Sequence, residues 1–191
     1  MSIADCEQEE TGWGVLDGLP GDPMMWVLVF SELVAFGLFL GAFIVAHAVR
    51  PAVFASGQAS LDVSLAGYNT IVLVTSGWAA ARGAASARAE QHRHARLWLV
   101  LAMALGGAFV AIKLVEYAGE IAGGVGLETS VFFTLYFLLT GFHLLHVCLG
   151  IIILAIVCRR ADPVHVETGT VFWHMVDLVW IVMFPIIYLV R

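Results

Sequence analysis

The chain of 191 residues is 61% hydrophobic and only 13% charged, with a formal net charge of −6. A soluble domain of this length could not bury so much apolar surface, so the composition excludes a water-soluble globular protein and indicates a membrane protein. The acidic balance gives no indication of a nucleic-acid partner, and the three cysteines show neither metal-ligand nor disulfide spacing.

The first 22 residues are polar and acidic, and they lack the basic start of a secretory signal. We therefore expect residues 1–22 to form an uncleaved, mobile tail in the cytoplasm. The acidic side chains of this segment are Asp5, Glu7, Glu9, Glu10, Asp17 and Asp22.

Five apolar stretches follow, and each is long enough to cross a bilayer. They predict an all-α fold, with one domain of five transmembrane helices over residues 23–191. The second stretch is the weakest, since it contains Asn69 and several small residues, and it should depend on neighbouring helices. The predicted spans are about Met24–Ala46, Leu65–Ala81, Leu97–Val115, Val131–Cys158 and Val171–Val190.

The short connections predict the orientation, because cytoplasmic loops carry an excess of lysine and arginine. The connections after the second and fourth spans hold Arg82, Arg88, Arg93, Arg96, Arg159 and Arg160. The other two connections and the C-terminus add only Arg50 and Arg191. This distribution predicts a cytoplasmic N-terminus and a periplasmic C-terminus.

The first span contains one ionisable residue, Glu32. Such residues are costly inside a membrane and usually face protein or water. Gly37 and Gly41 form a GxxxG pair that lets another helix approach closely, and they lie on roughly the opposite side of the helix from Glu32. The span should therefore meet protein or polar lipid groups on two sides, with a protonated and hydrogen-bonded Glu32 as an equal alternative.

The third span ends with Lys113, Glu116 and Glu120 on one face, at positions i, i+3 and i+7. Lys113 could extend to the outer interface or pair with Glu116. A structural ion pair is the preferred interpretation over a role in transport.

The fourth span places a stripe of polar and small residues within one face of the helix. Such a stripe suits hydrogen bonding against a neighbouring helix. His143 and His146 could also bind a metal, but two ligands leave a site half built, so other residues would have to complete it. The stripe consists of Tyr136, Thr140, His143, His146 and Gly150.

The fifth span brings His174 and Asp177 to one face, and Trp173 and Trp180 to another. His174 and Asp177 could form an imidazole oriented by a carboxylate. A purely structural pair is the more common use of this spacing.

Five segments, in this order over residues 24–190, resemble subunit III of the haem-copper oxidases. "FSELVAFGLFLGAF" contains Glu32, "LAGYNTIVLVTSGW" contains Asn69, and "LVEYAGEI" contains Glu116. "TGFHLLHVCLG" is the most specific match, and it holds Gly141 and both histidines of the fourth span. "ETGTVFWHMVDLVWI" resembles the closing segment of the family through Glu167, His174 and Asp177.

Larger members of this family have seven helices, and this chain lacks counterparts of the first two. It therefore resembles the short five-helix branch, which occurs with quinol oxidases and, as a separate protein, beside nitric oxide reductases. The opening of the first span and the short loops favour the nitric oxide reductase-associated type. The two missing helices form one wall of a lipid-holding cleft in long members.

The resemblance implies an accessory subunit of the bacterial inner membrane that has no catalytic residue and binds no haem, copper or other metal. It would pack against a catalytic subunit that contains haem and in some complexes copper, bind phospholipid and support proton uptake. The glycines Gly37, Gly41, Gly141 and Gly150 would serve helix packing. The residues expected to act as internal ties or as lipid and interface contacts are Glu32, Asn69, Glu116, His143, His146, Glu167, His174 and Asp177.

Two other interpretations use the same glutamates and histidines. They contain enough ligand types for a membrane-embedded metalloenzyme or metal transporter. Glu32 and the histidine stripe could also form a proton or ion carrier. The expected depths of these residues along their helices argue against one shared site, and the five spans show no inverted repeat of the kind found in transporters.

Overall fold

The computed structural model describes residues 23–160 and 162–190, so the predicted tail at residues 1–22 lies outside the described part. The described residues form six α-helices, which confirms the predicted all-α fold class. The helices are α1 (Pro23–Val49), α2 (Pro51–Ser60), α3 (Val63–Arg88), α4 (His92–Ala122), α5 (Val131–Arg160) and α6 (Pro163–Tyr188).

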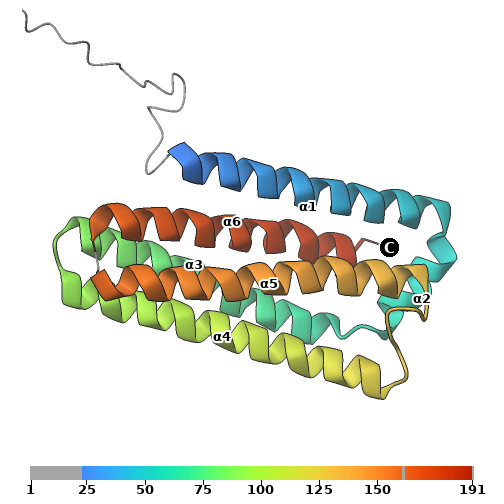
Figure 1. Cartoon of the computed structure of the whole chain (residues 1–191). Helices are drawn as coiled ribbons and strands as arrows, with labels where there is room; N and C mark the ends of the chain where they lie inside the picture. Colours follow the sequence, from blue (N-terminus) through green and yellow to red (C-terminus); the bar gives the residue numbers. More distant parts are fainter. Residues whose placement is uncertain (1–22, 161, 191) are drawn as a thin grey trace, which may run out of the picture.

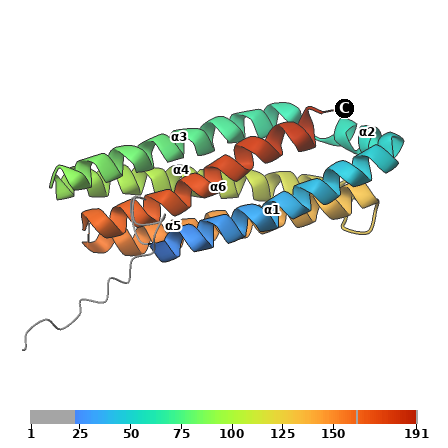
Figure 2. The same ribbon diagram turned by 90° about the horizontal axis from the view of Figure 1, so that it is seen from above.

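The five long helices lie side by side and alternate in direction (Figure 1). Four of them form a closed ring, in which α3 and α5 each pack against both α4 and α6. α1 lies outside this ring and contacts α5 and α6, as the view from above shows (Figure 2). One face of α1 therefore meets the bundle, and the other points away from it.

The two ends of the bundle differ in charge. Exposed Arg88, Arg93, Arg96 and Arg159 gather where α3 leads into α4 and α5 leads into α6. We call this the arginine-rich end. The opposite end, where α2 lies beside the end of α6, is called the α2 end (Figure 1).

Four helices, α1, α4, α5 and α6, are long and apolar enough to cross a membrane. α3 is not among them, although its 26 residues would extend about 39 Å at 1.5 Å per residue. Four of the five predicted spans are therefore helices of the required length and composition. A membrane crossing by α3 stays a prediction.

The connection between α3 and α4, predicted as a basic loop, is mostly helical, because only residues 89–91 separate the two helices. The N–H of Gln91 donates to the carbonyl of Ser86, and the N–H of Glu90 donates to that of Ala87. These two bonds form a Schellman motif, and Glu90 occupies its left-handed position with φ 59°. The turn holds α3 and α4 as a tight antiparallel pair.

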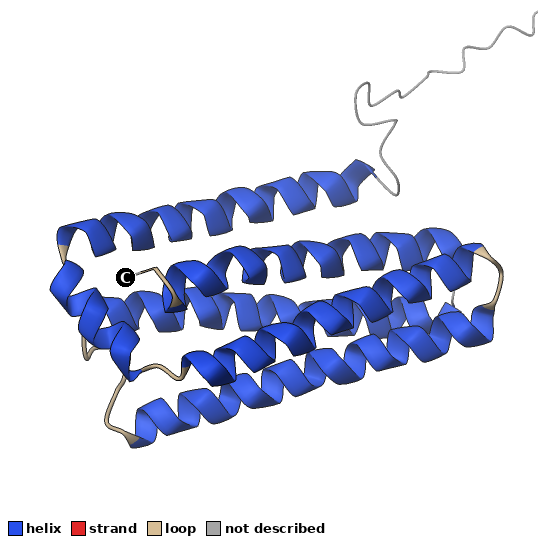
Figure 3. Cartoon of the chain, turned by 180° about the vertical axis from the view of Figure 1, so that it is seen from behind, coloured by secondary structure: helices blue, strands red, loops and turns tan. Residues whose placement is uncertain are grey.

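The connection after α1 contains the short helix α2, which the sequence did not predict. Pro51 stands in its first turn, where a missing N–H is tolerated. Buried Gln58 donates from Nε2 to the carbonyls of Ile187 at 2.9 Å and Val190 at 2.8 Å. Figure 3 shows this short helix beside the end of α6. α2 thus binds carbonyl groups that the end of α6 leaves without helical partners.

Trp173 of α6 fills a slot between two glycines on neighbouring helices. A Cβ added to Gly106 of α4 would lie 2.6 Å from Cη2 of Trp173, and one added to Gly150 of α5 would lie 2.7 Å from its Cε3. The fully buried indole therefore touches the backbone of both helices. No larger residue fits at either glycine unless the ring moves.

Candidate functional site

Lys113, the only lysine of the chain, is buried in α4. Its Nζ lies 3.0 Å from Oε1 of Glu116, 3.0 Å from the hydroxyl of Tyr136 in α5 and 2.6 Å from that of Tyr188 in α6. Both hydroxyls also donate to Oε1 of Glu116 at 2.6 Å. We call these four residues the Lys113 cluster. The expected ion pair is present, and two tyrosines extend it to three helices.

Four aromatic rings surround the Lys113 ammonium. Its Nζ lies 4.8 Å from the ring centre of Tyr136, 5.3 Å from those of Tyr117 and Tyr188, and 5.4 Å from that of Trp180. Distances below about 6 Å allow cation–π attraction. Because Tyr136 and Tyr188 contact Nζ through their hydroxyl oxygens, cation–π attraction is assigned to the rings of Tyr117 and Trp180.

Glu32 joins α1 to the ring of helices through His146 of α5. Its Oε2 lies 3.0 Å from Nε2 of His146, whose Nδ1 lies 2.8 Å from the carbonyl of Phe142. Because Nδ1 can donate to that carbonyl, the pair forms either with a charged imidazole and a carboxylate or with a neutral imidazole and a protonated Glu32. The geometry fits both ionisation states considered for Glu32.

His143 is fully buried among aromatic rings and does not share the surroundings of His146. It stacks on Trp180 with 5.1 Å between ring centres and meets the ring of Phe109 edge to face at 5.8 Å. Neither ring nitrogen has a hydrogen-bond partner among the described residues. The two histidines lie about 60° apart around the helix and nearly one turn apart along it, and each meets different neighbours.

Polar side chains connect α3 to the helices on either side of it. Asn69 donates from Nδ2 to the carbonyl of Phe109 in α4 at 3.3 Å, and Ser76 donates to that of Ala102 at 2.7 Å. On α6, Trp180 donates from Nε1 to the hydroxyl of Thr70 at 2.9 Å. These bonds agree with the expectation that the weakest predicted span depends on its neighbours.

Asp177 of α6 is buried against Gly77 of α3, where an added Cβ would overlap Oδ2 of the carboxylate. Nδ1 of His174 lies 3.7 Å from the same oxygen, which is too long for a direct hydrogen bond. The side chain of His174 is 46% exposed. The expected pair is therefore close, but the carboxylate does not hold the imidazole in one orientation.

Glu167 lies at the arginine-rich end and joins α6 to α3 through a two-pronged contact with Arg88. The guanidinium contacts the two carboxylate oxygens at 2.5 Å and 3.3 Å. The side chain of Arg88 is 60% exposed, so water weakens this pair. The contact is a surface tie between helices.

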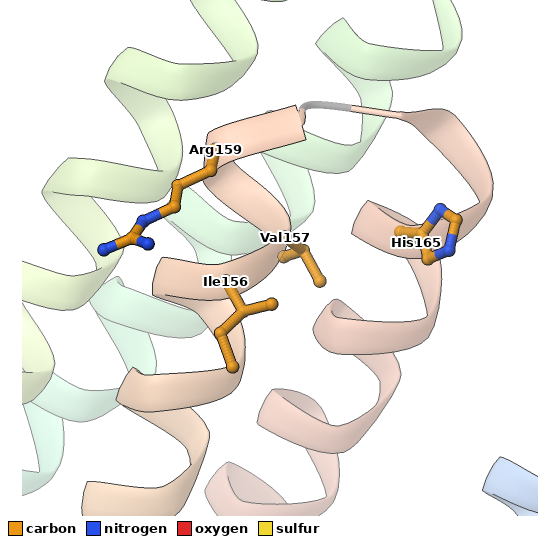
Figure 4. A pocket seen from close by; sticks show the side chains of 4 residues that line it. All are labelled: Ile156, Val157, Arg159 and His165. Atoms are coloured by element: carbon orange, nitrogen blue, oxygen red, sulfur yellow. The ribbon is translucent and has the colours of Figure 1, made fainter.

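A groove of about 300 Å³ lies between the end of α5 and the start of α6. Ile156 and Val157 form its apolar wall, with Arg159 and His165 on opposite sides (Figure 4). Asp162 caps the start of α6, and its Oδ1 lies 3.3 Å from Nδ1 of His165. The hydrogen bond from His165 lowers the pKa of Asp162. The groove thus combines an apolar wall with the guanidinium of Arg159 and the imidazole of His165 at its rim.

The four glycines expected to serve helix packing have different surroundings. Gly150 touches Trp173, whereas a Cβ added to Gly141 would meet only the hydroxyl of Tyr117, at 3.9 Å. Around Gly37 and Gly41, no atom of the described chain lies within 4 Å of such a Cβ. The close helix contact expected at this pair is therefore absent within the described chain, and the pair faces away from the bundle.

The predicted polar residues form separate contacts along the bundle, and no single site gathers them. Within the described ranges, no group of three or more His, Cys, Asp or Glu side chains could hold a metal ion. This geometry gives no support to the metalloenzyme interpretation. The sequence did not identify Gln58 and Tyr188 as members of these polar contacts. Each lies near a helix end, and no spacing pattern links it to its partner.

The chain is similar to known proteins along most of its length. The sequence model of a family described as Cytochrome c oxidase subunit III matches residues 14–190. A protein named cytochrome c oxidase subunit 3 from Synechocystis is 34% identical over 171 residues, covering 85% of this chain and 72% of that protein. Proteins of the same name from Thermostichus vulcanus and Corynebacterium diphtheriae are 28% and 30% identical, covering 85% and 86% of this chain and 84% and 85% of those proteins.

Proposed function

Because the chain belongs to the cytochrome c oxidase subunit III family, we propose that it is the accessory subunit III of a bacterial haem-copper oxidase. The observation that carries this proposal is the family match over residues 14–190, which includes all six helices. In this role the chain packs against a catalytic subunit that holds haem and copper, and it binds neither group itself.

The way in which the buried polar groups are used supports an accessory role. The Lys113 cluster joins three helices, the contact between Glu32 and His146 attaches a fourth, and Asn69 and Ser76 attach α3. Each of these groups has a partner within the chain. The arrangement suits a rigid membrane scaffold better than a reaction centre.

We propose the oxidase in place of the nitric oxide reductase-associated branch that the sequence favoured. The support is that the similar proteins from Synechocystis, Thermostichus vulcanus and Corynebacterium diphtheriae carry the name cytochrome c oxidase subunit 3. Identifying the complex that co-purifies with the chain distinguishes an oxidase from a nitric oxide reductase.

In the proposed topology all five long helices cross the bacterial cytoplasmic membrane. The arginine-rich end faces the cytoplasm, because positively charged loops are retained there. α1 starts at that end and α6 finishes at the α2 end (Figure 1), which suits a cytoplasmic N-terminus and a periplasmic C-terminus.

We propose that phospholipid covers the outer faces of the bundle and occupies the groove of Figure 4. The support is the aliphatic wall of Ile156 and Val157 beside Arg159, since an acyl chain fits the first and a phosphate the second. The partly exposed Glu32 is proposed to support proton uptake during turnover indirectly, by keeping α1 in place.

The replacement Glu32→Ala is expected to impair assembly and sustained turnover more than the initial rate. It removes the only described side-chain hydrogen bond between α1 and α5, so α1 should detach more easily during turnover. Oxygen consumption by the purified complex would be followed from the first seconds until activity decays. Glu32→Gln keeps a hydrogen-bonding partner for His146 and serves as the control. If initial electron transfer stops while the complex stays intact, this role for Glu32 is wrong.

The replacement Gly41→Leu is expected to remove most of the catalytic subunit from an affinity purification of this chain. Gly37 and Gly41 leave the outward face of α1 flat, which suits a closely packed helix of the partner. The matched control is Gly107→Leu, because Gly107 on α4 also has no atom of the described chain within 4 Å of an added Cβ. Equal recovery of haem with both variants would contradict a partner contact at α1.

The proposed function is tested by purifying the tagged chain in mild detergent and identifying the proteins that co-migrate with it. The expected result is a large haem-containing subunit with the absorbance of an oxidase. A nitric oxide reductase in its place would support the alternative branch. A chain that migrates alone, while the oxidase of the same membranes is complete without it, would refute the proposal.

A further inference from the structure

The surroundings of Lys113 have the chemistry of a ligand site. We propose that Glu116, Tyr136, Tyr188 and the ring of Trp180 form a binding site for a primary alkylammonium cation, which the chain fills with its own Lys113. The inference rests on contacts within the described chain and does not depend on the proposed function. The other eight cationic side chains of the sequence are arginines, so the lysine is used at this one position.

The hydrogen bonds around Nζ match the three-fold head of an ammonium. Tyr136 and Tyr188 each donate their only hydroxyl proton to Oε1 of Glu116, so towards Lys113 they act as acceptors. Nζ thus faces three oxygens, and an ammonium beside a carboxylate supplies one N–H group to each of them. A neutral amine has only two N–H groups and completes the arrangement only when a protonated Glu116 donates to its lone pair.

The rings and hydrogen bonds around Nζ together indicate the shape of the ligand. Tyr117, Tyr136, Tyr188 and Trp180 place their ring centres 4.8 to 5.4 Å from Nζ. Three hydrogen bonds fix the head group, and the alkyl stem enters from α4. A quaternary ammonium has no N–H to donate, and the planar fork of a guanidinium differs from the three-fold head of an ammonium. A linear primary ammonium satisfies all of these contacts.

The site connects α4, α5 and α6 near the α2 end, because its oxygen atoms come from all three helices. The cation is therefore the central ligand that draws them together. A covalent tether keeps it at high effective concentration, so no free ligand competes in the intact chain.

The first test uses the intact protein. Lysine labelled with ¹⁵N at Nζ gives a single side-chain signal, because the chain has one lysine. We expect the signal of a charged ammonium whose protons exchange slowly with water, and which resists amine-acylating reagents until the protein is unfolded. A neutral amine, or an ammonium that exchanges and acylates freely in the folded chain, would overturn the proposal.

The second test supplies the ligand from outside. Lys113→Ala removes three carbons and the nitrogen, which corresponds to propylammonium. We expect a large fall in the thermal midpoint of the variant in detergent, and propylammonium chloride should reverse most of it. Tetramethylammonium chloride at equal concentration should have no such effect. Equal effects of the two salts, or no effect of either, would contradict an alkylammonium site.

Two further variants keep the second test decisive. Lys113→Met fills the space of the alkyl stem, so it should fold with a lower midpoint but gain nothing from propylammonium. Lys113→Ala with Glu116→Gln lacks the carboxylate and should also show no recovery. Recovery in either variant would mean that the amine acts elsewhere on the protein.

Discussion

Lys113→Met is expected to lower the free energy of unfolding by about 3 to 5 kcal/mol, because the buried carboxylate of Glu116 then has no counter-charge. Glu116→Gln should cost a similar amount by leaving the ammonium without its carboxylate. The double variant removes both charges and should recover most of the loss. Unfolding of the purified protein in mixed micelles would give the three energies and the coupling between the two residues.

The control for this cycle is the exposed pair Arg88 and Glu167. Since Arg88 is 60% exposed, Arg88→Met and Glu167→Gln should each change stability by about 1 kcal/mol or less. If the double variant lost as much stability as the two single variants together, Lys113 and Glu116 would act independently. That result would contradict a buried ion pair whose members depend on each other. Equal effects at the buried and the exposed pair would contradict it as well.

The second large effect is expected at the slot that holds Trp173. Gly106→Ala and Gly150→Ala should each lower stability by about 1 to 3 kcal/mol, because the added methyl group meets the indole at less than contact distance. The double variant should lose more than either single variant, since the ring is then blocked on both sides. Unfolding measured by the same assay would give the values.

Gly107→Ala provides the matched control for the slot. Gly107 follows Gly106 on the same helix, yet a Cβ there would meet no atom of the described chain within 4 Å. Alanine should therefore stabilise α4 slightly, by about 0.5 to 1 kcal/mol. Adding Trp173→Phe to Gly150→Ala should relieve part of the overlap. A Gly150→Ala variant as stable as the wild type would show that the slot is not rigid.

The sequence predicted the helical class and the position of every long helix, because long apolar stretches carry this information directly. It placed the helix ends less well. The stretch predicted as Leu65–Ala81 belongs to a helix that runs from Val63 to Arg88. Small and basic residues continue a helix after its apolar part ends, and hydropathy does not register them. The helix α2 was missed because its ten residues are too short and too mixed to show a period.

The helix contacts of glycine were predictable only in part. The GxxxG pattern drew attention to Gly37 and Gly41, where an added Cβ would meet no other part of the described chain within 4 Å. Gly57 and Gly106 lie against aromatic rings, but no motif contains them. A spacing pattern describes one helix surface, whereas a close contact also depends on which ring the facing helix supplies.

The polar contacts were likewise predictable only where both residues lie close together on one helix. The pair of Lys113 and Glu116 follows from spacing on one helix and is present in the structure. Tyr188 reaches the same carboxylate from 72 residues away, which only the packing of the helices could determine. His143 and His146 are equivalent in the sequence motif, yet one is enclosed by rings and the other is paired with Glu32.

The short turn at residues 89–91 has a consequence for biogenesis. In the proposed topology α3 crosses the membrane, although it does not reach the hydrophobicity of the other long helices, so its transfer from a translocation channel into lipid would be less favourable. The Schellman turn joins α3 to the strongly apolar α4 through only a few residues. Asn69 and Ser76 can therefore form their hydrogen bonds as soon as the two helices touch. In the proposed topology, these bonds and the packing against α4 would hold the more polar α3 in the bilayer once both helices have been inserted.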